Sequence, residues 1–313
     1  MKTLKHTVLM VTYNQQDLLP IALDSLLSQS VLPYEIIISD DCSTDNTWDI
    51  IMVYSQKYPQ LIKPIRNEKN LGVFGNMNQL MKMPTGDVIS WLSGDDLYKP
   101  GIFEAFNKEI TQRGADPQKE KFIIISNAID LYYDGKETIY DNYRFRNSNL
   151  FKLKIRYGLN FRETGFSAAM WKQISPIRED IGYHADWIYS LNQIDMADSF
   201  YFINEAYPVY RMGVGVVSKS KMNSLVQSKL KVVSIIMDIY EKRLDESDKL
   251  FLKKEYVLNQ YFLQKNISNF CLSFYYILRN CNNYSTYKAW VKEMKMFLIV
   301  TGGAILRKMR LKK

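Results

Sequence analysis

The first hundred residues repeat one pattern, in which a short run of apolar and β-branched residues precedes a stretch with apolar residues at helical spacing. The runs are "HTVLMVTY", "YEIIIS", "LIKPIRN" and "GDVISWL", which begin at residues 6, 34, 61 and 86. Strands that alternate with helices predict an α/β fold with a mainly parallel central sheet and helices on both faces. In such sheets a ligand binds outside the carboxyl ends of the strands.

The order of the expected elements changes after residue 100. The sequence there predicts a helix over residues 100–114, a hairpin over residues 122–140 with an Asp134–Gly135 turn, and helical pieces around "FSAAMWKQI" and "ADWIYSLNQI". From about residue 219 the pattern is helical, with no Gly or Pro before Gly302. We therefore expect a domain boundary near residue 218.

The charge of the protein is concentrated at one end of the sequence. There are 41 Lys and Arg against 33 Asp and Glu, a net charge of +8. Residues 288–313 hold eight Lys and Arg and one Glu, so that 8 − 1 = +7 of this charge falls there. The rest of the chain is nearly neutral, which argues against a nucleic-acid-binding face on the main domain.

Cysteine and histidine usage restricts the kinds of site that we expect. Three cysteines and two histidines, widely spaced, form neither a zinc motif nor a disulfide framework, which favours a reducing compartment. The longest apolar stretch, residues 296–306, is shorter than the roughly 18 to 20 residues needed to span a bilayer. We therefore expect a cytoplasmic protein.

Two pairs of adjacent carboxylates follow two of the expected strands. Asp40 and Asp41 end "EIIIS", and Asp95 and Asp96 come shortly after "VISWL". Both pairs should lie on one carboxyl edge, and one member of each can face a ligand because successive residues point to opposite sides. A nucleotide diphosphate held through Mg²⁺ suits such an edge, since Mg²⁺ takes one or two protein carboxylates and fills its other positions with phosphate and water oxygens. Turn and helix-capping chemistry is the alternative explanation.

Four strings stand in order between residues 6 and 100: "VLMVTYNQ", "DDCSTDNT", "NLGVFGNMNQLMK" and "GDVISWLSGDD". Together they resemble the family 2 glycosyltransferases of the GT-A fold, which are inverting enzymes that use nucleotide-activated sugars. The similarity continues more weakly to about residue 218. It implies a GT-A domain over residues 1–218, with a nucleotide-sugar-binding half at 1–100 and an acceptor-binding half at 101–218, followed by a helical region over residues 219–313.

The resemblance assigns roles to residues of the donor half. Asp41 matches the aspartate that hydrogen-bonds the nucleotide base, with Tyr13 and Asn14 in the loop beside it. Uracil and thymine fit Asp41 best because each offers an N3 donor, which favours a UDP- or dTDP-sugar. The family loop that approaches the nucleotide is matched by Asn70, Gly72 and Asn78. Turns that precede helices use the same residue types.

The resemblance also implies a metal ion. Asp95 matches the last aspartate of the family's D-x-D motif, which binds Mg²⁺ or Mn²⁺, and Asp96 follows it. Ser93 stands at the first position of the motif, where the family has an aspartate. Its hydroxyl is both donor and acceptor and can bond a ribose. We therefore expect a divalent cation on Asp95, with Ser93 and Asp96 at the donor site.

The acceptor half must supply a base, because the acceptor hydroxyl loses its proton as it attacks the anomeric carbon. In the family the base is the aspartate of a Glu-Asp pair that opens a helix. Asp186 matches it, with Ala185 at the glutamate position. Arg211 in "VYRMGVGVVS" matches the family's closing segment and is expected to pair with phosphate oxygens. The structural alternatives are helix-charge compensation for Asp186 and an ordinary salt bridge for Arg211.

The favoured function is an inverting glycosyltransferase that moves a sugar from a nucleotide diphosphate donor to a glycan or lipid-linked glycan acceptor, in bacterial cell-surface polysaccharide assembly. Two alternatives stay open. Ser93 and Ala185 motivate a degenerate, non-catalytic glycan-binding module, which nucleotide release in the presence of donor and acceptor would exclude. A sugar nucleotidyltransferase would require a Gly-rich phosphate loop after the first strand. The segment "TYNQQDLL" contains no glycine, which disfavours this alternative.

Residues 290–313 combine an apolar stretch with flanking Lys and Arg, a composition typical of a helix that lies in a membrane interface. Each basic residue close to an anionic surface is worth about 1 kcal/mol. Packing on the main domain or on a second subunit is the alternative.

The full chain should sediment with anionic liposomes in a salt-sensitive way, and a chain that ends at Tyr287 should not. Equal sedimentation of the two chains would refute the membrane contact.

Overall fold

The computed structural model describes residues 4–157, 164–214, 221–264, 272 and 275. The basic stretch over residues 290–313 lies outside the described residues. Within the described part of the chain, no helix combines the length and the apolar composition that a membrane crossing requires.

The first half of the sheet is parallel, as the alternation of strands and helices predicts. It contains β1 (His6–Thr12), β2 (Glu35–Asp40), β3 (Ile62–Arg66) and β4 (Val88–Ser93), in the spatial order β3-β2-β1-β4. All residues of β1 and β2 are buried. This burial explains why these strands read as continuous apolar runs rather than as an alternating pattern.

The second half makes the sheet mixed. It adds β5 (Leu97–Tyr98), β6 (Phe122–Leu131), β7 (Glu137–Tyr140), β8 (Thr164–Ser167) and β9 (Ser199–Arg211). β8 runs antiparallel to both β4 and β6, and β9 runs parallel to β6. Of the segment expected to be helical, Phe166 and Ser167 belong to β8, and helix α6 (Ala168–Trp171) starts after them. The expected hairpin is present, because β7 pairs antiparallel with β6.

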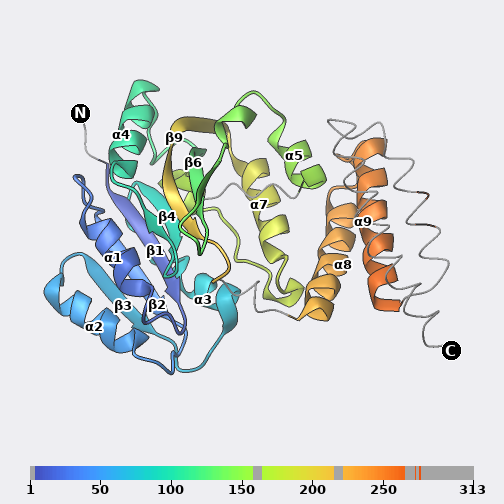
Figure 1. The fold of residues 1–313 in the computed structure, drawn as a ribbon. Helices are drawn as coiled ribbons and strands as arrows, with labels where there is room; N and C mark the ends of the chain where they lie inside the picture. The colour runs from blue at the N-terminus through green and yellow to red at the C-terminus, as the bar shows by residue number, and fades with distance from the viewer. Residues whose placement is uncertain (1–3, 158–163, 215–220, 265–271, 273–274, 276–313) are drawn as a thin grey trace. The chain divides into compact units, whose positions relative to one another are not determined.

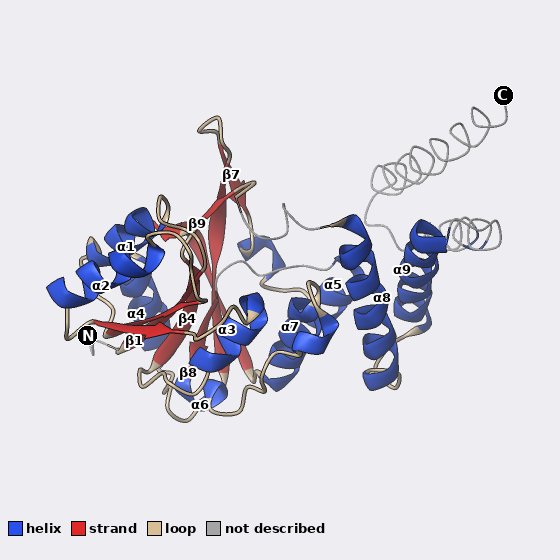
Figure 2. Ribbon diagram, turned by 90° about the horizontal axis from the view of Figure 1, so that it is seen from below, coloured by secondary structure: helices blue, strands red, loops and turns tan. Residues whose placement is uncertain are grey.

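Helices cover both faces of the sheet (Figures 1 and 2). On one face lie α1 (Leu19–Leu27), α2 (Thr47–Lys57) and α4 (Ile102–Gln112), and on the other lie α3 (Gly72–Leu80) and α6. Val8 and Met10 of β1 share a hydrophobic core with Leu23 of α1 and Phe106 of α4. Leu9, which points to the opposite face, is also fully buried. The remaining helices of this part are α5 (Leu150–Tyr157), α7 (Ala185–Met196) and the short 3₁₀ turns η1 (Tyr143–Phe145) and η2 (Glu179–Ile181).

The chain divides into two compact units. The first comprises Met1–Lys154, Leu159–Asp180 and Ala185–Ser220, and the second comprises Ile155–Gly158, Ile181–His184 and Lys221–Lys313. The first holds the sheet. The second holds α8 (Met222–Ile239) and α9 (Glu246–Gln264), which pack together. The boundary near residue 218 stays a prediction.

A buried charge cluster joins the two helices of the second unit. Glu255 lies 2.6 Å from Lys229 Nζ and 2.9 Å from Lys254 Nζ. Burial alone would raise the pKa of Glu255, but the two lysines lower it to about 2. The carboxylate therefore stays ionised inside the helix pair, where an unpaired charge would be strongly destabilising.

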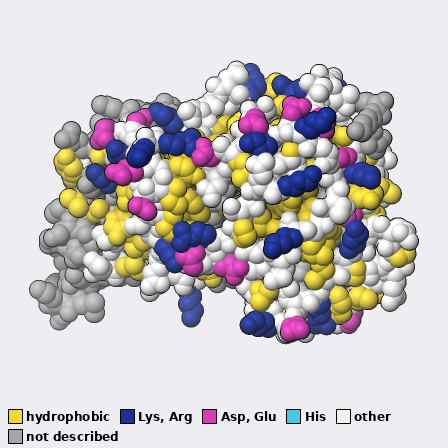
Figure 3. Space-filling view, turned by 180° about the vertical axis from the view of Figure 1, so that it is seen from behind, with side chains coloured by type: hydrophobic (Ala, Val, Ile, Leu, Met, Phe, Trp, Pro, Cys, Tyr) yellow, Lys and Arg dark blue, Asp and Glu magenta, His cyan; other side chains and the backbone are white. Residues whose placement is uncertain are grey.

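Basic side chains do not gather into a continuous area over the described residues on the face drawn in Figure 3. Lys and Arg are interspersed there with Asp, Glu and uncharged surface. A phosphate backbone is typically bound by clustered Lys and Arg, and this face of the described residues presents no such cluster.

A buried histidine at the start of β1 predicts a pH dependence of stability. His6 Nε2 lies 2.9 Å from Asn107 Oδ1, and the ring packs on Phe103. Burial lowers the pKa of His6 from 6.5 to about 4, against the raising effects of Asn107 and Asp87. The unfolded chain therefore binds the proton first as the pH falls. His6 should lower the free energy of unfolding between pH 6.5 and pH 4, by about 1.4 kcal/mol per pH unit at most.

Urea unfolding of wild type and His6→Gln at pH 7.5, 5.5 and 4.5 tests this expectation. Glutamine keeps an amide donor for Asn107 but cannot titrate, so the variant should show a smaller loss of stability on acidification than wild type. His184→Gln, which leaves His6 in place, is the matched control. Parallel curves for wild type and His6→Gln would contradict the assignment.

Candidate active site

The carboxyl ends of β2, β1 and β4 lie side by side at one edge of the sheet. β1 pairs with β2 on one side and with β4 on the other, so that Thr12 is opposite Asp40 and Val11 is opposite Ser93. This register brings both predicted carboxylate pairs to the same edge. The backbone N–H of Asp41 donates to the Thr12 carbonyl at 2.9 Å, which extends the pairing one residue beyond β2.

The loops that follow β1 and β2 are bonded to each other. Asn14 N–H donates to Ser43 Oγ at 2.9 Å, and Asn14 Oδ1 accepts from Thr44 N–H at 2.8 Å. Asn14 has a φ of 51°, in the left-handed region that Asn tolerates better than most residues. These bonds fix the loop that carries Tyr13, whose side chain is 43% exposed at the edge.

Asp40 and Asp41 have different environments. The carboxylate of Asp40 accepts from the backbone and hydroxyl of Ser43 and lies 3.3 Å from Arg66 Nε, so it closes the turn behind the edge. Asp41 Oδ1 accepts from Asn67 Nδ2 at 2.9 Å and from Leu71 N–H at 2.8 Å. Its Oδ2 accepts from Gly72 N–H at 2.9 Å. Because each carboxylate oxygen offers about two lone pairs, Oδ2 keeps one acceptor position for a further donor.

The three other residues predicted for the donor loop have separate structural roles. Asn70 Oδ1 accepts from Gly72 N–H at 3.0 Å, which closes a tight turn, and Gly72 has a φ of +76°. The amide of Asn78 bonds to the backbone N–H and carbonyl of Ile177 and to Glu179 Oε1. Asn78 thus ties α3 to the segment before η2. Nucleotide contact by these residues stays a prediction.

Ser93, Gly94, Asp95 and Asp96 form a tight turn at the end of β4. Asp96 N–H donates to the Ser93 carbonyl at 3.0 Å. A Cβ added at Gly94 would lie 2.5 Å from Gln15 Oε1 and 2.9 Å from Thr12 Oγ1, closer than real contacts allow. Glycine therefore lets this turn lie directly against the β1 loop. Asp95 and Asp96 are each only 9% exposed.

Arg211, the last residue of β9, is bonded to this turn. Its backbone N–H donates to Asp96 Oδ1 at 2.9 Å. Its guanidinium donates to the backbone carbonyl of Asp95 and, at 3.0 Å, to that of Leu18. Burial lowers the pKa of Arg211, and the charges of Asp96 and Asp95 oppose that change. Arg211 therefore lies at the edge with two of its donor groups bound to carbonyls, and its pairing with phosphate oxygens stays a prediction.

Asp186 is the second residue of α7. β9 starts at Ser199, opposite Phe122 at the beginning of β6, and α7 ends at Met196, just before it. The helix therefore runs back along the sheet, and its first turn lies toward the end at which β1, β2 and β4 finish (Figure 1). The positive end of the helix dipole favours an anionic carboxylate there.

Lys154 of α5 is a neighbour of Asp186 that the sequence does not reveal. Its side chain is fully buried, and burial lowers its pKa to about 8 against the opposing effect of the Asp186 charge. The Lys154 carbonyl accepts from Trp187 Nε1 at 3.0 Å, which joins α5 to the first turn of α7. In the sequence Lys154 is one of two lysines in "LFKLKIRY", and nothing in that pattern predicts which of them is buried.

The donor set at the edge fits one kind of metal site. Among the described residues, no three Asp, Glu, His or Cys side chains come together as a cage. Two adjacent, nearly buried carboxylates lie at the end of β4, and a serine takes the place of a third. Such a set suits a hard cation that receives most of its oxygen ligands from a diphosphate and water.

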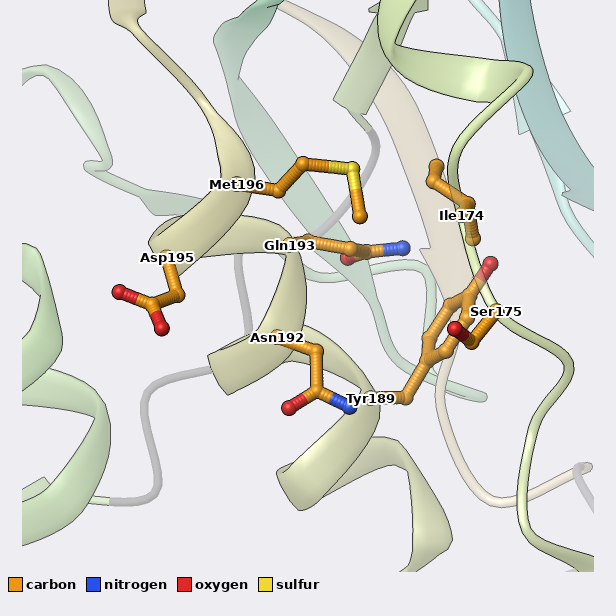
Figure 4. A pocket seen from close by; sticks show the side chains of 7 residues that line it. All are labelled: Ile174, Ser175, Tyr189, Asn192, Gln193, Asp195 and Met196. Atoms are coloured by element: carbon orange, nitrogen blue, oxygen red, sulfur yellow. The ribbon is translucent and has the colours of Figure 1, made fainter.

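A pocket of about 290 Å³ lies elsewhere, at the other end of α7 (Figure 4). It is lined by Ile174, Ser175 and side chains of α7 from Tyr189 to Met196. In Figure 4 the Tyr189 hydroxyl and the Gln193 amide point toward Ile174. None of the predicted site residues lines this pocket, so it is separate from the carboxyl edge.

Comparisons with known proteins agree on one family. The model of "Glycosyl transferase family 2" matches residues 7–174. The putative glycosyltransferase EpsE of Bacillus subtilis is 38% identical over 100 residues, which is 32% of this chain and 36% of that protein. The putative teichuronic acid biosynthesis glycosyltransferase TuaG of B. subtilis is 34% identical over 98 residues, 31% of this chain and 38% of that protein. These matches therefore span less than half the length of either relative.

Two solved structures resemble the fold. S. aureus TarS 1-349 in complex with UDP-GlcNAc has a TM-score of 0.60 at 17% identity, over 87% of this chain and 79% of that one. The mannosyltransferase PcManGT from Pyrobaculum calidifontis, in complex with GDP-Man and Mn²⁺, has a TM-score of 0.55 at 14% identity, over 96% of this chain and 81% of that one. At such identities the likeness concerns the fold alone.

Proposed function

Because this chain belongs to glycosyl transferase family 2, we propose that it transfers a sugar, with inversion, from a nucleotide diphosphate sugar to a glycan or lipid-linked glycan. The observation that carries the proposal is the single edge at which Asp41 and the Asp95–Asp96 pair meet. We assign residues 1–100 to donor binding, residues 101–218 to the acceptor side and residues 219–313 to a helical region that contacts a membrane through 290–313.

The donor nucleotide is proposed to bind across the ends of β1, β2 and β4. Asp41 would accept from the N3 donor of uracil or thymine through its remaining acceptor position, with Tyr13 and Asn14 beside the base. Asn70, Gly72 and Asn78 would line the nucleotide, and Ser93 would bond the ribose. The TarS complex with UDP-GlcNAc supports a uridine nucleotide, whereas PcManGT binds GDP-Man.

A divalent cation, Mg²⁺ or Mn²⁺, fits Asp95, and Asp96 holds the turn that presents it. When bound, such a cation supplies positive charge that stabilises a diphosphate leaving group. The Mn²⁺ in the PcManGT structure supports metal use in this fold. Arg211, fixed beside the turn, adds positive charge at the same place.

Asp186 is proposed to accept the proton of the acceptor hydroxyl. The acceptor oxygen forms a bond to the anomeric carbon as the bond from that carbon to the phosphate oxygen breaks. The electron pair of that bond leaves with the nucleoside diphosphate. Lys154 is buried near Asp186, and the Asp186 charge opposes the lowering of the Lys154 pKa by burial.

The acceptor class is proposed from a relative and from the charge of the chain. TuaG is named for teichuronic acid biosynthesis, which supports a polymeric, cell-surface glycan as the product. A lipid-linked acceptor agrees with a basic stretch at residues 290–313.

Two alternative functions predict other products. A non-catalytic binding module would bind donor without releasing nucleotide, and a nucleotidyltransferase would release pyrophosphate from a nucleoside triphosphate.

The metal assignment is tested by Asp95→Asn. The substitution removes one negative charge without changing the size of the side chain, so nucleotide release from the donor should fall to a few per cent of wild type while the melting temperature changes little. Asp49→Asn, on the exposed surface of α2, is the matched control and should keep full activity. Full wild-type activity in excess chelator would exclude the metal.

The base assignment is tested by Asp186→Asn. General base catalysis typically contributes about 10² to 10⁴ in rate, so turnover should drop on that scale. The affinity for UDP, measured by calorimetry, should stay the same because Asp186 lies on the acceptor side. Asp195→Asn, in the last turn of the same helix, controls for loss of a carboxylate from α7. Near wild-type turnover of Asp186→Asn would remove it from the mechanism.

A further inference from the structure

The β6–β7 hairpin projects away from the rest of the sheet (Figure 2). Its turn is closed by Tyr132 N–H donating to the Lys136 carbonyl and by Gly135 N–H donating to the Tyr132 carbonyl, both at 2.9 Å. Gly135 has a φ of +80°, the left-handed conformation that such turns require. The projecting end is therefore a formed hairpin with a fixed backbone.

Large apolar side chains on this hairpin face solvent. Tyr133 is 98% exposed, Ile139 is 70% exposed and Tyr132 is 37% exposed. Exposed to this degree, the Tyr133 ring contributes almost nothing to folding stability. Grouped exposed apolar residues are typical of a surface that binds something.

The hairpin leaves the sheet at the proposed donor site. β6 runs parallel to β4, because each is antiparallel to β8, so β6 also ends at the carboxyl edge. Its last residue, Leu131, pairs with Arg211, whose N–H binds Asp96. On β7, Oε2 of Glu137 lies 3.1 Å from Nζ of Lys99, the residue that directly follows β5.

The turn that carries Tyr133 lies close to Arg211 and so to the carboxylate turn at the end of β4. Tyr133 lies in the hairpin turn, two residues beyond Leu131, and two residues of chain span at most about 7 Å. Because Leu131 pairs with Arg211 and paired strands lie about 4.8 Å apart, the Cα of Tyr133 is at most roughly 12 Å from that of Arg211.

We propose that the β6–β7 hairpin is an acceptor-binding arm, on which the Tyr133 ring stacks against a pyranose of the acceptor glycan and Tyr132 and Ile139 extend the contact. The inference rests on the proposed function, because it names the acceptor contact of the same site. A pyranose has an apolar C–H face that suits an aromatic ring, and polar neighbours can bond its hydroxyls.

The charges of the hairpin favour a glycan over a membrane. Between Leu131 and Tyr140 there is one Lys against one Asp and one Glu, so the net charge is 1 − 2 = −1. Anionic lipids attract basic segments and repel this one. β7 is also only four residues long, which is short for adding a strand from a second copy.

Tyr133→Ala tests the arm. Saturation-transfer NMR with cellobiose, chitobiose and lactose as probes reports glycan binding, and UDP calorimetry reports the donor site. Wild type should bind at least one disaccharide, and Tyr133→Ala should bind it about tenfold more weakly, as expected for loss of one aromatic contact. Tyr133→Phe, which keeps the ring, should bind like wild type. UDP affinity and the melting temperature should be the same in all three proteins.

Tyr34→Ala is the matched control. Tyr34 is 46% exposed, but it precedes β2 at the opposite edge, where its N–H donates to the His6 carbonyl. The Tyr34→Ala variant should therefore bind disaccharides as wild type does. Equal disaccharide binding by wild type and Tyr133→Ala would overturn the arm, as would a change in oligomeric state or in liposome binding without a change in disaccharide binding. If wild type bound none of UDP, dTDP and GDP, the proposed function itself would be overturned.

Discussion

The parallel pairing of β1 with β2 on one side and with β4 on the other is the constraint on which the candidate site depends. It brings three strand ends, 12, 40 and 93, to one edge. A slip of one residue in either pairing would turn every side chain to the opposite face of the sheet. Because all residues of β1 and β2 are buried, such a slip would exchange the side chains that pack on the two covered faces, and the core therefore fixes the position of the carboxylates.

Within each acidic pair, at least one carboxylate stabilises the backbone. Asp40 closes the turn after β2, and Asp96 receives the N–H of Arg211 from β9. Buried carboxylates need hydrogen-bond donors or cations as partners, and these contacts supply them from the protein. Asp41 and Asp95 are the members that we assign to ligands.

The sequence predicts the first half of the molecule well, for physical reasons. Buried parallel strands read as apolar runs, and residue order along them determines which side chains reach the carboxyl edge. The antiparallel strand β8 escapes prediction because its four residues carry no alternation. Gly165 within it fits where a Cβ would lie 2.7 Å from side-chain atoms of Ile124 and Phe106. The burial of Lys154 cannot be predicted from the sequence because it depends on tertiary packing.

The exposure of Tyr133 cannot be predicted either, because an aromatic residue in a hairpin is more often packed than solvated.

The central claim is that the carboxyl edge of β1, β2 and β4 binds a nucleoside diphosphate together with a divalent cation. Calorimetric titration of the full chain with UDP, in the presence of Mn²⁺ and again in excess chelator, tests it most directly. We predict one UDP bound per chain with Mn²⁺ and much weaker binding in chelator, since the cation joins the diphosphate to Asp95. No binding of UDP, dTDP or GDP under either condition would contradict the account.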